Sequence, residues 1–281
     1  MKIAMIISGR ISRYEVGLLK TLNNNNIHEI DLFVSINSEE CEYINNAKSD
    51  LSEWIKGWYV SPYEIDKLFF DLIKPEEWEI SKRIGNLCSC QLINNKYIPY
   101  NAMSMFFNDK NAFEMAKKYA DDNNFEYDCY MKYRSDIIDT NIPEKLEFYP
   151  QTLISNTPIC QFNGNGIYKV PIVCDAWAWG DRSVMSVYFS TYDYVLNKVI
   201  NTDGHYFVNF EDNITDNIYE NNIQVHFVKH RYYLDVNRRI FDKTWENGNI
   251  TDTRNVNISG ALEPIDIKSI SKLDIPPQIQ E

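Results

Sequence analysis

The chain has 281 residues, 44% of them hydrophobic, which is enough apolar material for a packed globule with a sizeable core. Its formal net charge of −12 excludes the basic surface expected of a nucleic-acid-binding protein and gives no reason to expect docking on an anionic membrane. No stretch approaches the ~20 apolar residues of a transmembrane helix, and the first apolar run is too short for a signal peptide. We therefore expect a cytoplasmic protein with no membrane span. Its six cysteines are scattered, which predicts no disulfide framework.

The chain opens with the pattern of an α/β fold. The apolar run 3–7 ends at Ser8 and Gly9, as a buried parallel strand does where it enters a loop. Residues 14–22 have helical spacing, and residues 30–36 predict a second strand. This β-loop-α-β opening is typical of nucleotide-binding α/β domains. Residues 39–100 show no clear periodicity and predict short helices and irregular connections.

A helix followed by a buried strand is predicted in the middle of the chain. Residues 108–124 carry apolar side chains at helical spacing and end in a polar stop. Residues 127–133 predict a strand that ends at Arg134-Ser135-Asp136. Ligands of open α/β sheets bind at the carboxyl ends of the strands, so this segment is the clearest candidate site.

The remaining elements are shorter. Residues 171–174 predict a strand that leads to Asp175, and Asp181 has the character of the N-cap of a helix running to about residue 195. A further helix is expected from Phe210, followed by a strand over residues 223–228. The chain becomes polar after about residue 239. We therefore expect one α/β domain over residues 1–240, with a mainly parallel central sheet flanked by helices, and a C-terminal extension over 241–281.

The charged residues after the central strand suit a phosphate-bearing ligand. A carboxylate such as Asp136 can bind Mg²⁺ or Mn²⁺, which prefer hard oxygen ligands and would neutralise a diphosphate. The guanidinium of Arg134 could contact phosphate oxygens directly through its planar fork of donors. The alternative is a solvated charge pair at a strand end.

Four blocks occur in an order and spacing that resemble a known family. They are residues 2–14, residues 31–35, residues 108–136 with the Arg-Ser-Asp segment, and residues 175–185. Glu211 resembles a fifth and weaker mark. Together they span about residues 1–230 and resemble a GT-A-type glycosyltransferase-like family of capsule, surface-polysaccharide and viral glycan loci.

This resemblance implies a GT-A-like fold and transfer of a sugar from a nucleoside-diphosphate sugar to a hydroxyl of a glycan acceptor. The nucleotide-sugar-binding residues that it implies are Ser8, Gly9, Arg10, Arg13, Arg134 and Asp136. Arg134 and Asp136 take the place of the family's Asp-x-Asp motif, so Asp136 would be the ligand of Mn²⁺ or Mg²⁺. Since arginine replaces the first carboxylate, metal dependence stays open.

The block from Asp175 to Asp181 is the candidate acceptor site. An inverting transferase needs a carboxylate that deprotonates the acceptor hydroxyl, and either Asp175 or Asp181 could be this catalytic base. Trp177 and Trp179 lie between them and could bind the apolar face of an acceptor sugar. In the alternative interpretation, Asp181 only caps its helix and the tryptophans belong to the core.

Two other functions compete with glycosyl transfer. A catalytically inactive member of the same fold would bind a nucleotide or glycan as a module, as the replaced carboxylate would suggest. The second alternative is a nucleotidyltransferase that makes activated sugars. That class normally has a glycine-rich, lysine-bearing loop after its first strand, and residues 9–13 contain too little glycine to suit it.

On a helix, His226 and His230 would share a face and could bind a metal ion, but their surroundings alternate as in a strand, which breaks that geometry. A late histidine completes the metal site of some GT-A enzymes, so this role stays open for His226. The basic cluster 229–231 could instead contact a diphosphate or form a solvated strand end.

Overall fold

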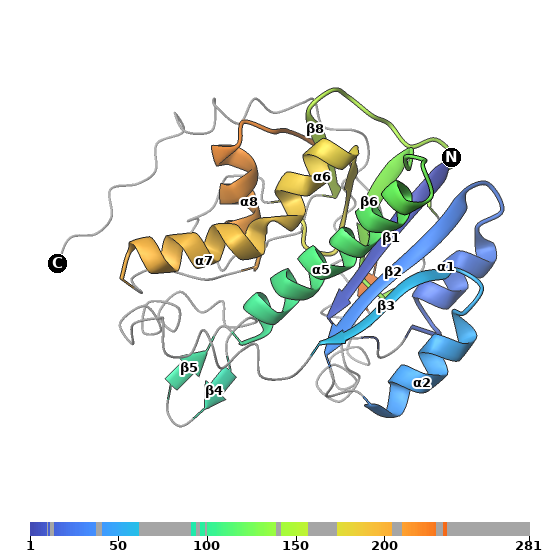
Figure 1. The fold of residues 1–281 in the computed structure, drawn as a ribbon, viewed down its shortest axis with the longest axis horizontal. Coiled ribbons are helices and arrows are strands. Elements are labelled where there is room, and N and C mark those ends of the chain that lie inside the picture. The colour runs from blue at the N-terminus through green and yellow to red at the C-terminus, as the bar shows by residue number, and fades with distance from the viewer. Residues whose placement is uncertain are drawn as a thin grey trace, which may run out of the picture.

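The computed structural model describes residues 1–9, 11, 14–37, 41–61, 91–93, 96–98, 100–138, 142–156, 173–203, 210–228 and 233–234. These residues form an α/β domain with a seven-stranded sheet between helices (Figure 1). Arg10, Arg13, His230 and the predicted extension 241–281 lie outside the described residues.

The elements are as follows. The strands of the main sheet are β1 (Lys2–Gly9), β2 (Glu29–Asn37), β3 (Ile55–Ser61), β6 (Cys129–Tyr133), β8 (Thr152–Asn156), β9 (Trp177–Gly180) and β10 (Gln224–Val228). The helices are α1 (Leu18–Asn24), α2 (Cys41–Asp50), α5 (Tyr100–Asp122), α6 (Arg182–Phe189), α7 (Thr191–Asn201) and α8 (Phe210–Glu220). Two small antiparallel pairs are β4 (Gln91–Ile93) with β5 (Lys96–Ile98), and β7 (Ile137–Ile138) with β11 (Tyr233–Leu234).

The main sheet has the strand order β10-β8-β9-β6-β1-β2-β3. Strands β3, β2, β1 and β6 pair in parallel, and so do β8 and β10. Strand β9 runs antiparallel to both of its neighbours, β6 and β8. The prediction of a mainly parallel sheet is therefore confirmed, with one reversed strand inside it.

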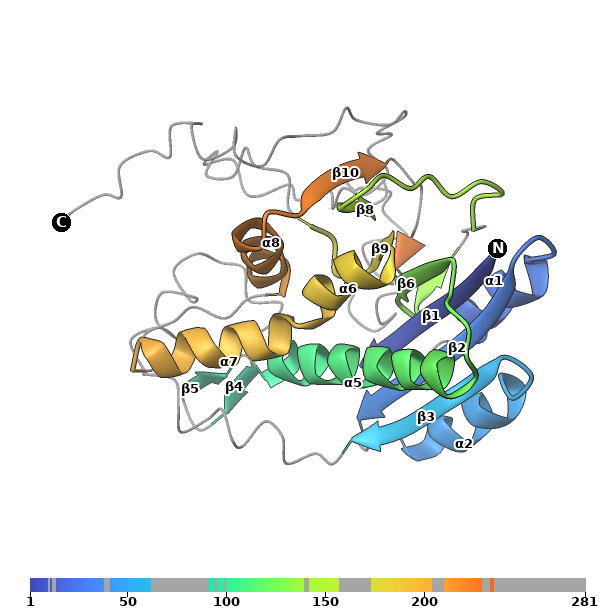
Figure 2. The same ribbon diagram turned by 45° about the horizontal axis from the view of Figure 1, so that its top comes forward.

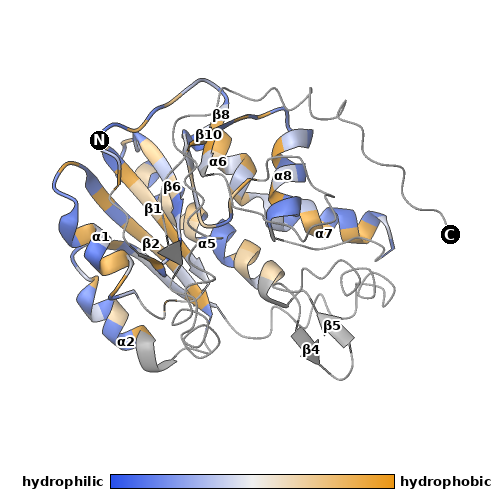
Figure 3. Ribbon diagram, turned by 180° about the vertical axis from the view of Figure 1, so that it is seen from behind, coloured by the Kyte–Doolittle hydropathy of each residue, from blue (hydrophilic) through white to orange (hydrophobic). Residues whose placement is uncertain are grey.

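Strand β1 has side chains buried on both faces, as expected of a central parallel strand. Ala4 and Ile6 belong to a core cluster with residues of α5, whereas Ile3, Met5 and Ile7 belong to a second cluster with residues of α1 and α2. Helix α5 thus covers one face of the sheet while α1 and α2 cover the other (Figure 2). Helices α1, α7 and α8 carry both hydrophilic and hydrophobic residues (Figure 3), the composition that suits helices with one face on a core.

Helix α1 begins later than the sequence predicts. Residues 14–17 form a turn, and the helix starts at Leu18. Gly17 precedes the first helical residue, and a larger residue does not fit there because its Cβ would clash with the backbone oxygen of Ser135. The amide of Leu18 donates a hydrogen bond to the same oxygen at 3.2 Å. The start of α1 is therefore packed directly on the backbone turn that follows β6.

Several other predicted boundaries are also wrong. No strand includes Val173 and Cys174; the strand in this region is β9, which begins after Asp175 instead of ending before it. The helix predicted from Asp181 is divided at Ser190 into α6 and α7. Helix α5 begins at Tyr100, a full two turns before the predicted start. In the described part of the chain, no helix is long and apolar enough to cross a membrane.

Candidate functional site

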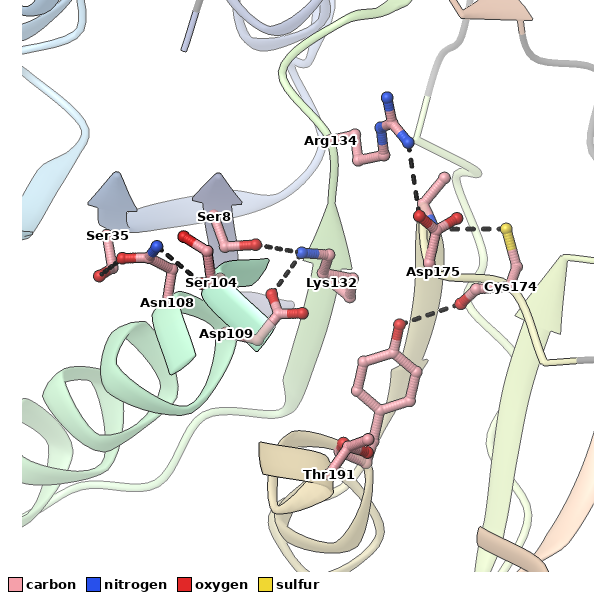
Figure 4. Close-up of polar contacts among 12 residues, drawn as sticks. Ser8, Ser35, Ser104, Asn108, Asp109, Lys132, Arg134, Cys174, Asp175 and Thr191 are labelled. Atoms are coloured by element: carbon pink, nitrogen blue, oxygen red, sulfur yellow. Dashed lines mark hydrogen bonds and ion pairs between the residues drawn. The ribbon is translucent and has the colours of Figure 1, made fainter. Parts of the chain in front are cut away.

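Polar side chains gather at the edge of the sheet where the parallel strands β1, β2 and β6 end (Figure 4). Because β9 is antiparallel, its beginning lies at this same edge: Tyr133 pairs with Trp177, and the amide of Arg134 donates to the oxygen of Ala176 at 3.1 Å. The segment after β6 and the segment before β9 are thus neighbours. This places Arg134 beside Asp175, although the two are far apart in sequence.

The guanidinium of Arg134 joins two carboxylates. Its Nε donates to Asp136 Oδ1 at 3.0 Å and its Nη2 to Asp136 Oδ2 at 2.9 Å, a bidentate pair. Its Nη1 donates to Asp175 Oδ2 at 3.4 Å. The side chain of Arg134 is 31% exposed, against 19% for Asp136 and 12% for Asp175, so a ligand from solvent can reach the guanidinium.

Glu211 completes this cluster from the first turn of α8. Burial, followed by the negative charge of Asp175, raises the pKa of Glu211 to about 8, while the positive charge of Arg134 opposes the shift. The hydroxyl of Thr215 donates to the backbone carbonyl oxygen of Glu211 at 2.7 Å and accepts from the backbone amide of Val173 at 2.9 Å. This bridge fixes the start of α8 against the segment that leads to Asp175. The sequence marked Glu211 only as a weak resemblance, because its partner segments are distant along the chain.

A buried ion pair lies beneath the cluster, on the face covered by α5. The ammonium of Lys132, which is fully buried, contacts the carboxylate of Asp109 on α5 and donates to the hydroxyl of Ser8 at the end of β1. Burial raises the pKa of Asp109, and the positive charge of Lys132 opposes that rise. Sequence analysis missed both charged residues, since a lysine inside an apolar strand shows no partner in the local pattern.

Gly9, a predicted nucleotide-sugar-binding residue, is the last residue of β1. Its φ of +82° lies in the region that favours glycine, and no described atom lies within 4 Å of the position that a Cβ would take. Among the described residues, none fills the space beside this backbone. Ser8 is 6% exposed and is engaged with Lys132, so in this structure its hydroxyl supports the strand end instead of facing solvent.

A network of small polar side chains continues the edge toward β2 and β3. The Oδ1 atom of Asn37 accepts hydrogen bonds from Asn108 at 2.7 Å, Ser104 at 2.8 Å and Ser61 at 3.1 Å. The hydroxyl of Ser35 donates to Asn108 Oδ1 at 2.7 Å. These bonds connect the first half of α5 to the carboxyl ends of two strands, and so hold Asp109 in place.

The structure separates the two predicted catalytic aspartates. Asp175 precedes β9 at the edge that carries Arg134, whereas Asp181 follows β9 at the opposite edge. There its Oδ1 caps α6 by accepting from the amide of Val184 at 2.9 Å. The next residue, Arg182, pairs with Asp121 and Glu126, which precede β6. We therefore correct the prediction for Asp181: it is a helix cap and lies too far from Asp175 to share its site.

The two tryptophans proposed to bind an acceptor lie in the core. Trp177 is 0% and Trp179 is 2% exposed, and both pack in the cluster on the α1 side of the sheet. The indole nitrogen of Trp179 donates to the backbone oxygen of Glu147 at 3.2 Å. Neither ring has a face open to a sugar, so the alternative core interpretation is correct for both residues.

The described residues contain no group of three His, Cys, Asp or Glu side chains arranged to hold a metal ion. His226 lies in strand β10, as its alternating surroundings predict, and packs against the ring of Tyr149 at 5.1 Å between centroids. Asp136, the predicted metal ligand, has both carboxylate oxygens engaged by Arg134.

No protein-family model matches the sequence, and no curated protein matches it. Similar solved structures include the apo form of mouse xyloside xylosyltransferase 1, which is 13% identical over 78% of this chain and 81% of its own, with a TM-score of 0.40. Another is a nucleoside-diphosphate-sugar pyrophosphorylase from Vibrio cholerae RC9, which is 6% identical over 80% of this chain and 90% of its own, with a TM-score of 0.34. At such identities and scores this similarity concerns the general α/β arrangement alone.

Proposed function

We propose that this chain is a GT-A-like glycosyltransferase that moves a sugar from a nucleoside-diphosphate sugar to a hydroxyl of a glycan acceptor. The observation that carries the proposal is the grouping of Arg134, Asp136, Asp175 and Glu211 at the carboxyl edge of the sheet, beside the backbone of Gly9. Open α/β sheets bind their ligands at this edge. The reaction needs a positive charge that stabilises the diphosphate leaving group and a carboxylate that accepts the proton of the acceptor hydroxyl. The site contains both kinds of side chain.

In the proposed reaction, the acceptor oxygen forms a bond to the anomeric carbon of the donor sugar. The bond from that carbon to the diphosphate oxygen breaks, and its electron pair leaves with the diphosphate. The guanidinium of Arg134 stabilises the charge that develops there. The proton of the acceptor hydroxyl passes to a carboxylate.

Two adjacent carboxyl groups are candidates for the proton acceptor. The Oδ2 atom of Asp175 is already engaged by Arg134 Nη1, at 3.4 Å. Glu211 has a pKa of about 8, close to the pH at which a general base is most effective. We therefore assign the proton to Glu211 and assign Asp175 the task of raising its basicity.

The proposal is tested by a donor screen with purified full-length protein. Uridine- and guanosine-diphosphate sugars are added in turn, thermal unfolding is recorded, and release of the nucleoside diphosphate is then measured with and without a glycan acceptor. We expect one donor to raise Tm and to be turned over. Asp136→Ala removes the carboxylate that holds Nε and Nη2 of Arg134, so it should lose both effects while still unfolding cooperatively. Stabilisation without any turnover would favour a non-catalytic binding module.

A further inference from the structure

The site raises the question of which cation neutralises the diphosphate. A divalent ion would need carboxylate oxygens as ligands. Both oxygens of Asp136 accept hydrogen bonds from Arg134, at 3.0 and 2.9 Å. An ion bound to these oxygens would lie within a few ångströms of a guanidinium, and two positive charges at that separation repel each other. The arrangement of these side chains therefore does not fit a metal ion.

The guanidinium instead takes the central position itself. It contacts Asp136 on one side and Asp175 on the other, and its charge acts on Glu211 as well. A guanidinium stays charged at all ordinary pH values, and its planar fork matches phosphate oxygens as well as carboxylates. Its side chain is 31% exposed, so it can exchange a carboxylate partner for a phosphate.

We propose that Arg134 is the resident cation of the site and that the protein binds a diphosphate without a divalent metal. This inference rests on the proposed function for the identity of the ligand, but not for the exclusion of the metal. It predicts a specific gain: when Arg134 is removed, the carboxylates of Asp136 and Asp175 are released and can bind a metal ion.

The test is a titration of the protein with Mn²⁺ alone, in which the electron paramagnetic resonance signal of the unbound ion measures how much Mn²⁺ is bound. Arg134→Ala should bind Mn²⁺ at least tenfold more tightly than the wild type. Asp136→Asn in the Arg134→Ala background should abolish the gain. Circular dichroism and thermal unfolding establish that each variant is folded.

Arg182→Ala is the matched control. Arg182 also pairs with two carboxylates, Asp121 at 2.7 Å and Glu126 at 3.0 Å, and its removal changes the net charge equally. It lies at the opposite edge of the sheet, so its variant should bind Mn²⁺ as weakly as the wild type.

Wild-type binding of Mn²⁺ that equals or exceeds that of Arg134→Ala would overturn the inference. Wild-type binding that disappears in Asp136→Asn would also overturn it, and this comparison needs no variant of Arg134. The titration requires neither donor nor turnover. A failed donor screen would therefore reject the proposed function without affecting the inference about the cation. Sugar transfer that is abolished by a metal chelator would reject the inference about the cation and leave the proposed function intact.

Discussion

Burial and the negative charge of Asp175 raise the pKa of Glu211, and the positive charge of Arg134 lowers it. The balance raises the pKa of Glu211 to about 8, so the group holds its proton at neutral pH and releases it in mildly alkaline solution. A carboxyl in this state is a stronger base than an ordinary glutamate once it is ionised. The pH dependence of the reaction should therefore report on this residue.

The expected profile of kcat/KM in the wild type rises with pH and levels off above about 8. Asp175→Asn removes a negative charge that raises the pKa of Glu211, so the rise should move to lower pH while activity persists. Glu211→Gln should lower kcat by about 10²-fold or more, the usual contribution of a general base. An inactive Asp175→Asn with an active Glu211→Gln would reverse the assignment and make Asp175 the base.

At the scale of single elements, α6 depends on its cap. The carboxylate of Asp181 accepts from the amide of Val184 and from the hydroxyl of Ser183, at 2.9 and 2.6 Å. These bonds satisfy a donor that the first turn of a helix otherwise leaves without a partner. The cap lies far from Arg134, across the length of β9.

Asp181→Ala should lower the free energy of unfolding by about 1 kcal/mol, the usual value of an N-cap, and should leave the rate of sugar transfer unchanged. Asp181→Asn keeps an acceptor at the cap and should change stability much less. Urea denaturation and the transfer assay measure the two effects. Loss of transfer in a stably folded Asp181→Asn would restore this residue as a candidate base.

Sequence patterns predict elements well where the pattern is local. Strand β1 contains the continuous apolar run 3–7, β2 is apolar in its interior apart from Asp31 and Ser35, and α8 and β10 follow regular spacing, so their positions agree with the predictions. Strand β9 was misplaced because its Trp-Ala-Trp-Gly segment becomes a strand by pairing with β6 and β8, which no local pattern shows. Strand β3 was missed because, as an edge strand with several partly exposed side chains, it carries no apolar run.

The sequence predicts those site residues that follow a local pattern and does not predict those that meet only through the fold. A strand that leads to Arg134 and Asp136 is visible in the sequence, and the structure places Asp175, another predicted site residue, beside Arg134. The pairing of Lys132 with Asp109 could not be foreseen, because it joins a strand to a helix through the core. The tryptophans were misread because aromatic residues beside acidic ones are typical both of sugar sites and of cores.

At the scale of the whole molecule, the pair of Lys132 and Asp109 connects β6, β1 and α5 through the interior. Two opposite charges in a core cost desolvation energy, which their attraction must offset. Removal of one partner leaves the other charge buried without compensation. Replacing one member of the pair should therefore destabilise the protein more than replacing both with apolar residues.

Lys132→Met should lower the free energy of unfolding by about 3–5 kcal/mol, whereas Lys132→Met combined with Asp109→Leu should recover much of the loss. Denaturation in urea at pH 7 measures both variants, and the slope of the transition shows whether unfolding stays cooperative. A single variant that costs less than about 1 kcal/mol would contradict a buried ion pair at this position.

The approach of Gly17 to the backbone of Ser135 bears on affinity. The turn that carries Arg134 and Asp136 is held by the start of α1, whose Leu18 and Leu22 are buried in the core. This backbone is therefore ordered before any ligand arrives. A donor that engages the turn loses no conformational entropy in arranging it, and only the side chain of Arg134 has to be reoriented. Substitutions on α1, far from any contact with the ligand, would loosen this preorganised turn and weaken binding mainly by faster dissociation.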